Sequence, residues 1–293
     1  MSLYELEEPI DLQEPVIVAA FDGWVDGGQA GTLAAEQLAD GGRVIATFDA
    51  DRLFDYRARR PTLDITDGRL LDLDWPRLTL STTHVADRDL LVLTGPEPDY
   101  RWREFSAAVI ELLRTLRVSS WVSLGAIPAT VAHTRPVPIL GTSSAAGLLP
   151  EGVSQGPAGH LRVPSAALSV LELAASQAGI PAIGFYAQVP HYASGAFPNA
   201  AVELIKRVGQ YLGLELPLGE LPRQALETRA LLDAAVSADE RTSSYVERLE
   251  QMSDESRLPA GDELIADIER FLRDRGGDDG GSRGGNQGGG LPN

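Results

Sequence analysis

The chain has 293 residues, 43% of them hydrophobic, which is enough to bury the core of one large domain, with or without an appendage. Its formal net charge of -17 argues against partners such as nucleic acid or an anionic membrane, because binding to phosphates needs clustered lysine and arginine. The absence of cysteine, of a secretory signal in MSLYELEEPIDL and of any membrane-length apolar run predicts a cytoplasmic protein without disulfides.

Apolar runs typical of buried strands alternate with helical patterns as far as residue 212. Strands are predicted at 16–20, 44–48, 90–94, 121–124 and 183–188, and helices at 31–39, 105–116, 166–178 and 199–212. This alternation predicts a mostly parallel sheet with helices on both faces. Residues 63–84 interrupt it with short antiparallel strands, and residues 125–159, rich in Pro, Gly, Ser and Thr, predict a functional loop that contains a strand at 137–140.

From Leu221 onward, helices follow one another with no strand between them. They are predicted at 224–236, 239–252 and 262–273; the segment 237–240 fits a capping box, and Phe271 belongs to an apolar stripe on the last helix. Residues 276–293 are rich in glycine and are predicted to be disordered. The sequence thus predicts an α/β core domain over 1–219, a three-helix appendage over 220–275 and a disordered tail over 276–293.

The segment from Val16 to Gly31, VIVAAFDGWVDGGQAG, predicts a strand, an acidic and glycine-rich elbow, and a helix. Sites in open α/β sheets lie at the carboxyl ends of strands, in loops of this kind. Asp22 and Asp26 have the chemistry of an acid–base pair or of cation ligands, and the glycines would let a ligand approach the helix N-terminus. The alternative is an aspartate that caps the helix and glycines that only form the turn. The spacing matches neither GxGxxG nor a P-loop.

Four other loops add polar residues at predicted strand ends or beside them. DYRARRP places three arginines in four positions, suited to carboxylate or phosphate or to neutralising Asp22, Asp26 or Asp55. Two prolines hold Glu97 in GPEPDYRW; His133 is a candidate base and Arg135 a candidate anion clamp in HTRP; and PHY follows the last strand. Each loop also has a purely structural interpretation.

Together the five loops predict one rim around a pocket. Its candidate residues are Asp22, Trp24, Asp26, Gly28, Arg57, Arg60, Glu97, His133, Arg135, His191 and Tyr192. No HExxH or Cys/His spacing indicates a metal site, and Ser143-Ser144 lacks the elbow context of a serine hydrolase. No catalytic residue is assigned and no cofactor is expected.

The motifs FDGWVDGGQAG, DYRARRP, GPEPDYRW, HTRP and PHY together resemble the actinobacterial branch of the proteasome assembly chaperone 2 family over residues 5–275. The resemblance implies a three-layer α/β domain similar to the nucleoside phosphorylase/hydrolase-like fold, and a homo-oligomer, with a trimer favoured. Eukaryotic and archaeal relatives act as non-enzymatic partners of 20S proteasome subunits. Some archaeal relatives end in a hydrophobic-Tyr-X motif that docks into proteasome pockets, whereas this chain ends in Gly-Leu-Pro-Asn.

Two functions are therefore expected. The first is a non-enzymatic protein-binding or assembly-chaperone-like role, linked to the proteasome system through a partner such as a proteasome subunit. The alternative is an enzyme that acts on a small anionic or nucleoside-like molecule at the rim. The enzyme requires Asp22, Arg60, Glu97 and His191 to converge on one concave site.

Overall fold

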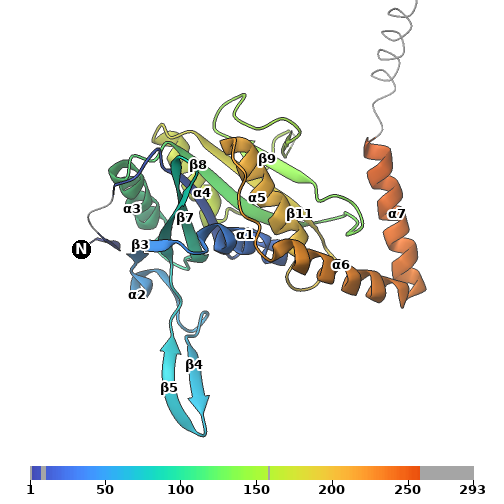
Figure 1. The fold of residues 1–293 in the computed structure, drawn as a ribbon, viewed down its shortest axis with the longest axis horizontal. Helices are drawn as coiled ribbons and strands as arrows, with labels where there is room; N and C mark the ends of the chain where they lie inside the picture. The colour runs from blue at the N-terminus through green and yellow to red at the C-terminus, as the bar shows by residue number, and fades with distance from the viewer. Residues whose placement is uncertain (1, 8–10, 158, 258–293) are drawn as a thin grey trace, which may run out of the picture.

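A nine-stranded mixed sheet forms the centre of the molecule in the computed structural model, which describes residues 2–7, 11–157 and 159–257 (Figure 1). In spatial order its strands are β1 (Tyr4–Leu6), β3 (Arg43–Phe48), β6 (Thr79–Val85), β7 (Arg88–Pro96), β2 (Val16–Asp22), β8 (Ser120–Ala129), β11 (Ala182–Pro190), β9 (Ile139–Ser143) and β10 (Ser154–Gln155).

The sheet is mixed, parallel in its middle and between β9 and β10 at one edge and antiparallel elsewhere, which corrects the expectation of a mostly parallel sheet. Strands β7, β2, β8 and β11 pair in parallel, whereas β1, β3, β6 and β7 pair antiparallel and β9 runs against β11. A short turn joins β6 to β7, and such a turn forces antiparallel pairing, because a parallel pair needs a long crossover. The alternation of strands and helices in the sequence therefore predicts the parallel centre of the sheet but not its antiparallel pairs.

Helices cover both faces of the sheet. Helices α1 (Ala30–Ala39) and α5 (Pro198–Leu212) pack on one face, and α3 (Trp102–Thr115) and α4 (Ala167–Gln177) on the other, with the short α2 (Ala50–Leu53) after β3. The comparison with the nucleoside phosphorylase/hydrolase-like fold stays a prediction.

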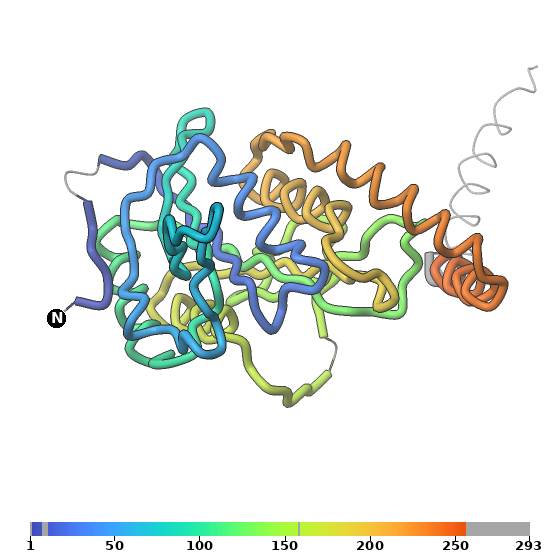
Figure 2. Tube along the Cα trace, turned by 90° about the horizontal axis from the view of Figure 1, so that it is seen from below, coloured from blue at the N-terminus to red at the C-terminus, as the bar shows by residue number. Residues whose placement is uncertain are grey.

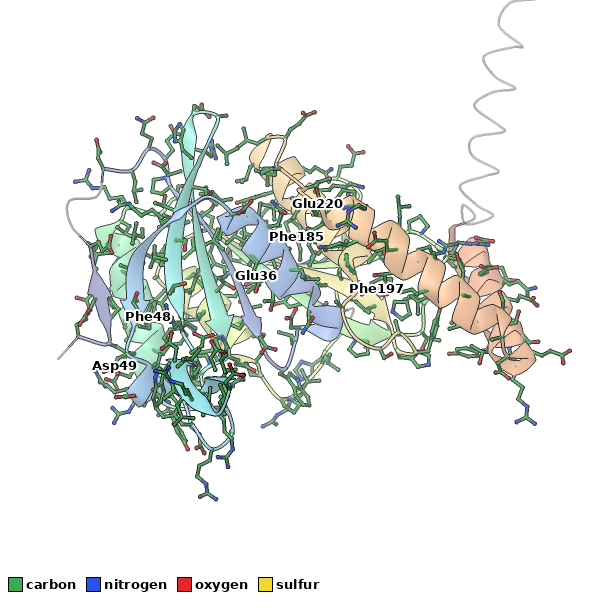
Figure 3. All side chains as sticks on the ribbon, turned by 60° about the horizontal axis from the view of Figure 1, so that its bottom comes forward. Glu36, Phe48, Asp49, Phe185, Phe197 and Glu220 are labelled. Atoms are coloured by element: carbon green, nitrogen blue, oxygen red, sulfur yellow. The ribbon has the colours of Figure 1, made fainter. Side chains whose placement is uncertain are left out.

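Strand β2 is buried from Val16 to Phe21 because it contributes to both cores. Val16, Val18 and Ala20 pack with α1 and α5, whereas Ile17, Ala19 and Phe21 pack with α3 and α4. A strand covered on both sides needs apolar residues at every position, which is why it appears in the sequence as an unbroken apolar run. Figure 3 labels Phe48 from the α3/α4 core, and Phe185 and Phe197 from the α1/α5 core.

The predicted antiparallel excursion at 63–84 consists of β4 (Thr62–Thr66), β5 (Arg69–Asp74) and β6. Strand β6 joins the large sheet, whereas β4 and β5 form a separate two-stranded sheet. This hairpin projects from the body (Figure 1).

Helix α6 (Leu221–Ser237) packs against α5 and leads to α7 (Glu240–Arg257) at the far end of the molecule (Figure 2). The predicted capping box at 237–240 is wrong, because Asp239 and not Ser237 caps the helix. Asp239 Oδ2 accepts the Thr242 N–H at 2.9 Å, whereas the Ser237 hydroxyl donates to the Asp233 carbonyl at 2.8 Å. The predicted helix at 262–273, with Phe271, and the tail at 276–293 lie outside the described residues. The three-helix appendage and the domain boundaries therefore stay predictions.

Candidate functional site

Asp26 of the elbow is tied to the first turn of α1. Its Oδ1 accepts the N–H groups of Gly31 at 2.7 Å and Thr32 at 3.2 Å, and its Oδ2 accepts the Thr32 hydroxyl. Burial raises the pKa of Asp26, and these hydrogen bonds oppose the rise. The contacts match the capping role that the sequence offered as the alternative to acid–base chemistry.

The elbow glycines are needed for close packing. Gly28 has a φ of +63°, and a Cβ placed on it would lie 2.7 Å from the Cβ of Phe197. A Cβ on Gly23 would lie 2.4 Å from Oε2 of Glu97. Protein atoms therefore occupy the space through which a ligand would approach the backbone at these two positions.

Glu97 connects three segments with its carboxylate and its backbone. Its Oε2 accepts the Trp24 N–H at 3.0 Å, and its Oε1 accepts the Ala167 N–H at 2.7 Å, in the first turn of α4. Its own N–H donates to the Asp22 carbonyl at 2.9 Å. A carboxylate at a helix N-terminus is favourable because it meets free N–H groups and the positive end of the helix dipole. Both carboxylate oxygens are therefore engaged within the fold.

Arg59, which is absent from the predicted pocket, is the arginine of DYRARRP that reaches the elbow. Its Nη1 lies 3.8 Å from Oδ2 of Asp22, its Nη2 donates to the Asp22 carbonyl at 3.4 Å, and its Nε lies 3.6 Å from Oδ1 of Asp99. Arg57 and Arg60 are exposed. The sequence indicated that an arginine here faces Asp22, but only the path of the loop decides which of three neighbours does so.

A hollow of about 380 Å³ lies beside Asp22, with Thr32, Glu36 and Arg77 among its lining residues. Burial raises the pKa of Glu36, and the negative charges of Asp26 and Asp22 add to the rise. Figure 3 labels Glu36 on α1. The carboxylates of Asp22 and Glu36 and the hydroxyl of Thr32 could bind a small polar or cationic group in this hollow. The ligand expected at the rim is anionic.

A second polar group surrounds His133, which is buried. The Tyr192 hydroxyl accepts the His133 backbone N–H at 2.9 Å and lies 2.7 Å from its Nδ1, while Nε2 lies 3.1 Å from Oδ1 of Asp233 on α6. This pattern assigns the ring proton to Nε2, which donates to the carboxylate. Burial lowers the pKa of His133, and Asp233 partly opposes the drop.

Arg135 and His191 belong to this second group. The Arg135 guanidinium donates to both carboxylate oxygens of Asp254 on α7, at 2.9 and 2.7 Å. The ring and backbone nitrogens of His191 lie 3.2 and 3.1 Å from the Ala129 carbonyl, and its Nε2 lies 3.5 Å from the Tyr245 hydroxyl. The side chain expected to clamp an anionic ligand thus binds a carboxylate of this chain.

The sheet register explains why the predicted residues gather in two places. Strand β2 pairs with β8 only as far as Ala19 and Ser123. From that level β2 runs to Asp22 and β8 to Ala129, so β8 ends about 10 Å farther along. Asp22, Trp24, Asp26 and Glu97 therefore gather at the ends of β2 and β7, with Gly28 in the same elbow and Arg57 and Arg60 in the loop of Arg59. His133, Arg135, His191 and Tyr192 lie beside α6 and α7.

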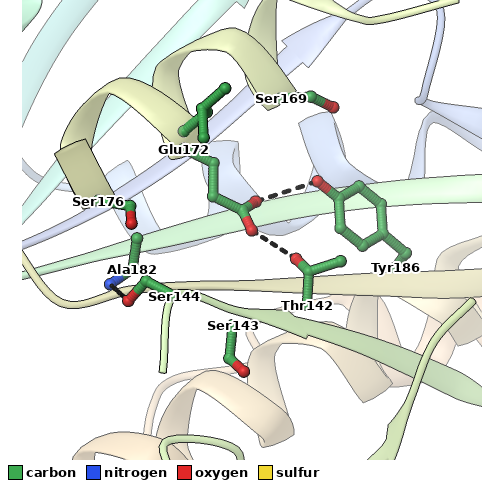
Figure 4. A pocket seen from close by; sticks show the side chains of 9 residues that line it. Thr142, Ser143, Ser144, Ser169, Glu172, Ser176, Ala182 and Tyr186 are labelled. Atoms are coloured by element: carbon green, nitrogen blue, oxygen red, sulfur yellow. Dashed lines mark hydrogen bonds between the residues drawn. The ribbon is translucent and has the colours of Figure 1, made fainter. Parts of the chain in front are cut away.

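A further hollow, of about 350 Å³, lies between α4, β9 and β11 (Figure 4). The Glu172 carboxylate accepts the hydroxyls of Thr142 at 2.5 Å and Tyr186 at 3.2 Å, and burial raises the pKa of Tyr186. The other hydroxyl groups that line the hollow come from Ser143, Ser144, Ser169 and Ser176. These residues come from three separate elements, so no local motif in the sequence predicts the hollow. Of its lining residues, the sequence analysis considered only Ser143 and Ser144.

In the described part of the chain, there is no group of three or more His, Cys, Asp or Glu residues that could hold a metal ion. Over the same residues, none of the helices combines the length and the apolar character that crossing a membrane requires.

The PAC2 family model matches residues 20–236. A protein of unknown function from Corynebacterium glutamicum is 32% identical, with a TM-score of 0.80 over 86% of this chain and 97% of that one. A proteasome-assembly chaperone homologue from Mycobacterium tuberculosis is 34% identical, with a TM-score of 0.72 over 79% and 99%. A PAC2 family protein from Streptomyces avermitilis is also 34% identical, with a TM-score of 0.71 over 79% and 99%. None of the curated proteins matches the sequence.

Proposed function

Because this chain belongs to the PAC2 family, we propose that it is a non-enzymatic, assembly-chaperone-like protein whose partners include a proteasome subunit. The Mycobacterium tuberculosis relative, itself a proteasome-assembly chaperone homologue, shares 34% of its residues with the chain. That likeness supports the choice of partner.

The observation that carries the proposal is that the candidate catalytic groups interact with the chain's own atoms. Asp26 binds the first turn of α1, both oxygens of Glu97 accept backbone N–H groups, and His133 lies between Tyr192 and Asp233. A general acid or base must reach a proton of its substrate. Groups held in this way stabilise a surface on which another protein can bind.

The enzyme alternative has less support. It needs Asp22, Arg60, Glu97 and His191 around one concave site, whereas His191 contacts Ala129 and Tyr245 in the second polar group. We therefore propose the binding role ahead of an enzyme acting on a small anionic or nucleoside-like molecule.

We also propose that the protein is cytoplasmic and forms a homo-oligomer, with a trimer as the favoured state. Self-association would multiply the copies of each partner-binding surface, and multivalent presentation raises avidity without a new contact.

Immobilised full chain, incubated with purified proteasome α and β subunits and analysed by pull-down and native mass spectrometry, tests the partner. A discrete complex that persists at about 0.3 M salt is expected, since salt screens contacts made by net charge alone. An unrelated protein of similar negative charge is the control. Equal retention of subunits by this control, or no complex with either subunit, would refute the proposal.

A further inference from the structure

The hairpin of β4 and β5 has no cover among the described residues. Its two strands pair only with each other, and every residue of both strands is exposed. The hairpin also projects away from the layers of the body (Figure 1). An isolated two-stranded hairpin is only marginally stable in water, so this one needs a partner surface.

The two faces of the hairpin differ sharply in chemistry. Residues opposite each other in a ladder share a face, which puts Leu63 with Leu73 and Ile65 with Leu70. The bulge in β5 places Leu71 beside Leu70, opposite Ile65. These five side chains, the apolar hairpin face, are between 40% and 69% exposed. The reverse face carries three carboxylates and one guanidinium group, those of Asp64, Asp72, Asp74 and Arg69.

A contiguous apolar face of this kind marks an interaction surface, because left open it promotes aggregation. The reverse face shows which side stays in water, because burying three carboxylates beside the single guanidinium of Arg69 would be costly. The hairpin is thus built to be covered on one side only.

We infer that the apolar hairpin face is buried against a second copy of this chain; the inference rests on the homo-oligomer of the proposed function. The face is a permanent part of the fold, so its cover must be available whenever the chain folds. Another copy is present wherever the chain is synthesised, whereas a different protein is present only when it is produced in step.

The chain also carries a surface that complements the hairpin. Trp24, 71% exposed, and Tyr100, 50% exposed, lie in the elbow and in the loop after β7, and the exposed Arg57 and Arg60 lie in the loop whose Arg59 contacts both Asp22 and Asp99. Together Trp24, Tyr100, Arg57 and Arg60 form the aromatic–arginine surface. Its rings suit the leucines of a neighbouring hairpin, and its guanidinium groups complement the net negative charge of that hairpin from the edge of the contact, where the charged groups stay in water.

The donor hairpin and the acceptor surface share no residue, although Arg57 and Arg60 lie in the loop that leads into β4. A contact between them is therefore heterologous, and repeated contacts of this kind close into a ring when the rotation between copies allows it. A ring of three copies is the favoured outcome.

The first test replaces Leu63, Ile65 and Leu70 together by threonine, which keeps β propensity while removing apolar contact. The matched control makes the same replacement at Leu226 and Leu231 of α6, which are both 73% exposed. Light scattering after gel filtration and native mass spectrometry should show an oligomer for the wild type and the control. The hairpin variant should be a monomer, with self-association weakened at least about 100-fold.

A second variant tests the acceptor and remains informative if the hairpin variant misfolds. Trp24→Ser alone should also yield monomers, and circular dichroism should match the wild type. Mixing Trp24→Ser with the hairpin variant should restore dimers, since one intact donor still meets one intact acceptor. Failure of the mixture to associate would overturn the donor–acceptor contact.

A monomeric wild type at about 50 μM, or an unchanged oligomer in the folded hairpin variant, would overturn the inference. Protection of the hairpin from hydrogen exchange only after a proteasome subunit is added would also overturn it, in favour of that subunit as cover. The proposed function has a separate readout: an intact oligomer that captures no proteasome subunit refutes the function and leaves the hairpin contact standing.

Discussion

Replacing Glu97 measures how strongly one carboxylate holds the elbow, the loop after β7 and the start of α4 together. Glu97→Ala removes the acceptor of the Trp24 N–H at 3.0 Å and of the Ala167 N–H at 2.7 Å. A hydrogen bond to a charged group contributes about 1.5–3 kcal/mol, and the partly exposed setting favours the lower end. The variant should therefore lose about 2–4 kcal/mol of unfolding free energy.

Glu97→Gln separates charge and number of acceptors from shape. Its single carbonyl oxygen can accept one of the two N–H groups, so about half of the loss, 1–2 kcal/mol, is expected. Urea unfolding followed by circular dichroism at neutral pH measures both variants. Glu151→Gln, in an exposed loop, is the control and should change the unfolding free energy by less than about 0.5 kcal/mol.

The free energy of unfolding should increase from Glu97→Ala to Glu97→Gln to the wild type if the two hydrogen bonds to the carboxylate stabilise the fold. If Glu97→Ala unfolds at the same urea concentration as the Glu151 control, the carboxylate does not stabilise these segments.

Asp26→Ala should cost about 0.5–2 kcal/mol through loss of the α1 cap, and Asp26→Asn less, since its amide oxygen can still accept the Gly31 N–H; equal losses in urea unfolding would contradict capping. Burial lowers the folded-state pKa of His133 below 6.5, so its contribution to stability is complete above pH 6.5 and is lost as pH falls through the folded pKa. Thermal melts of His133→Asn should therefore show a shallower loss of stability between about pH 6.5 and 5 than the wild type, while His160→Asn, an exposed control, should follow the wild type. Leu249→Ala, on the side of α7 that packs against Ala132, should cost about 2–3 kcal/mol and speed limited proteolysis of that helix; unchanged cleavage would mean that α7 is held by its polar contacts alone.

The family resemblance and the main elements could be predicted from the sequence. The run at 16–20 indicated a buried strand because β2 packs on both faces, and such packing excludes polar residues. Asp26 and the elbow glycines indicated a helix start because capping and positive φ are local properties of a few adjacent residues.

Only the tertiary structure decided which polar side chains meet. Arg59 rather than Arg57 or Arg60 reaches Asp22, because the path of the loop orients three chemically identical neighbours. His133 meets Asp233 because α6 returns to the end of β8, and Glu172 meets Tyr186 because α4 lies over β11. These contacts join residues far apart in the chain, and their distances depend on strand order and register. Composition and local spacing determine the main strands and helices, whereas the geometry of the candidate site arises only when the sheet is assembled.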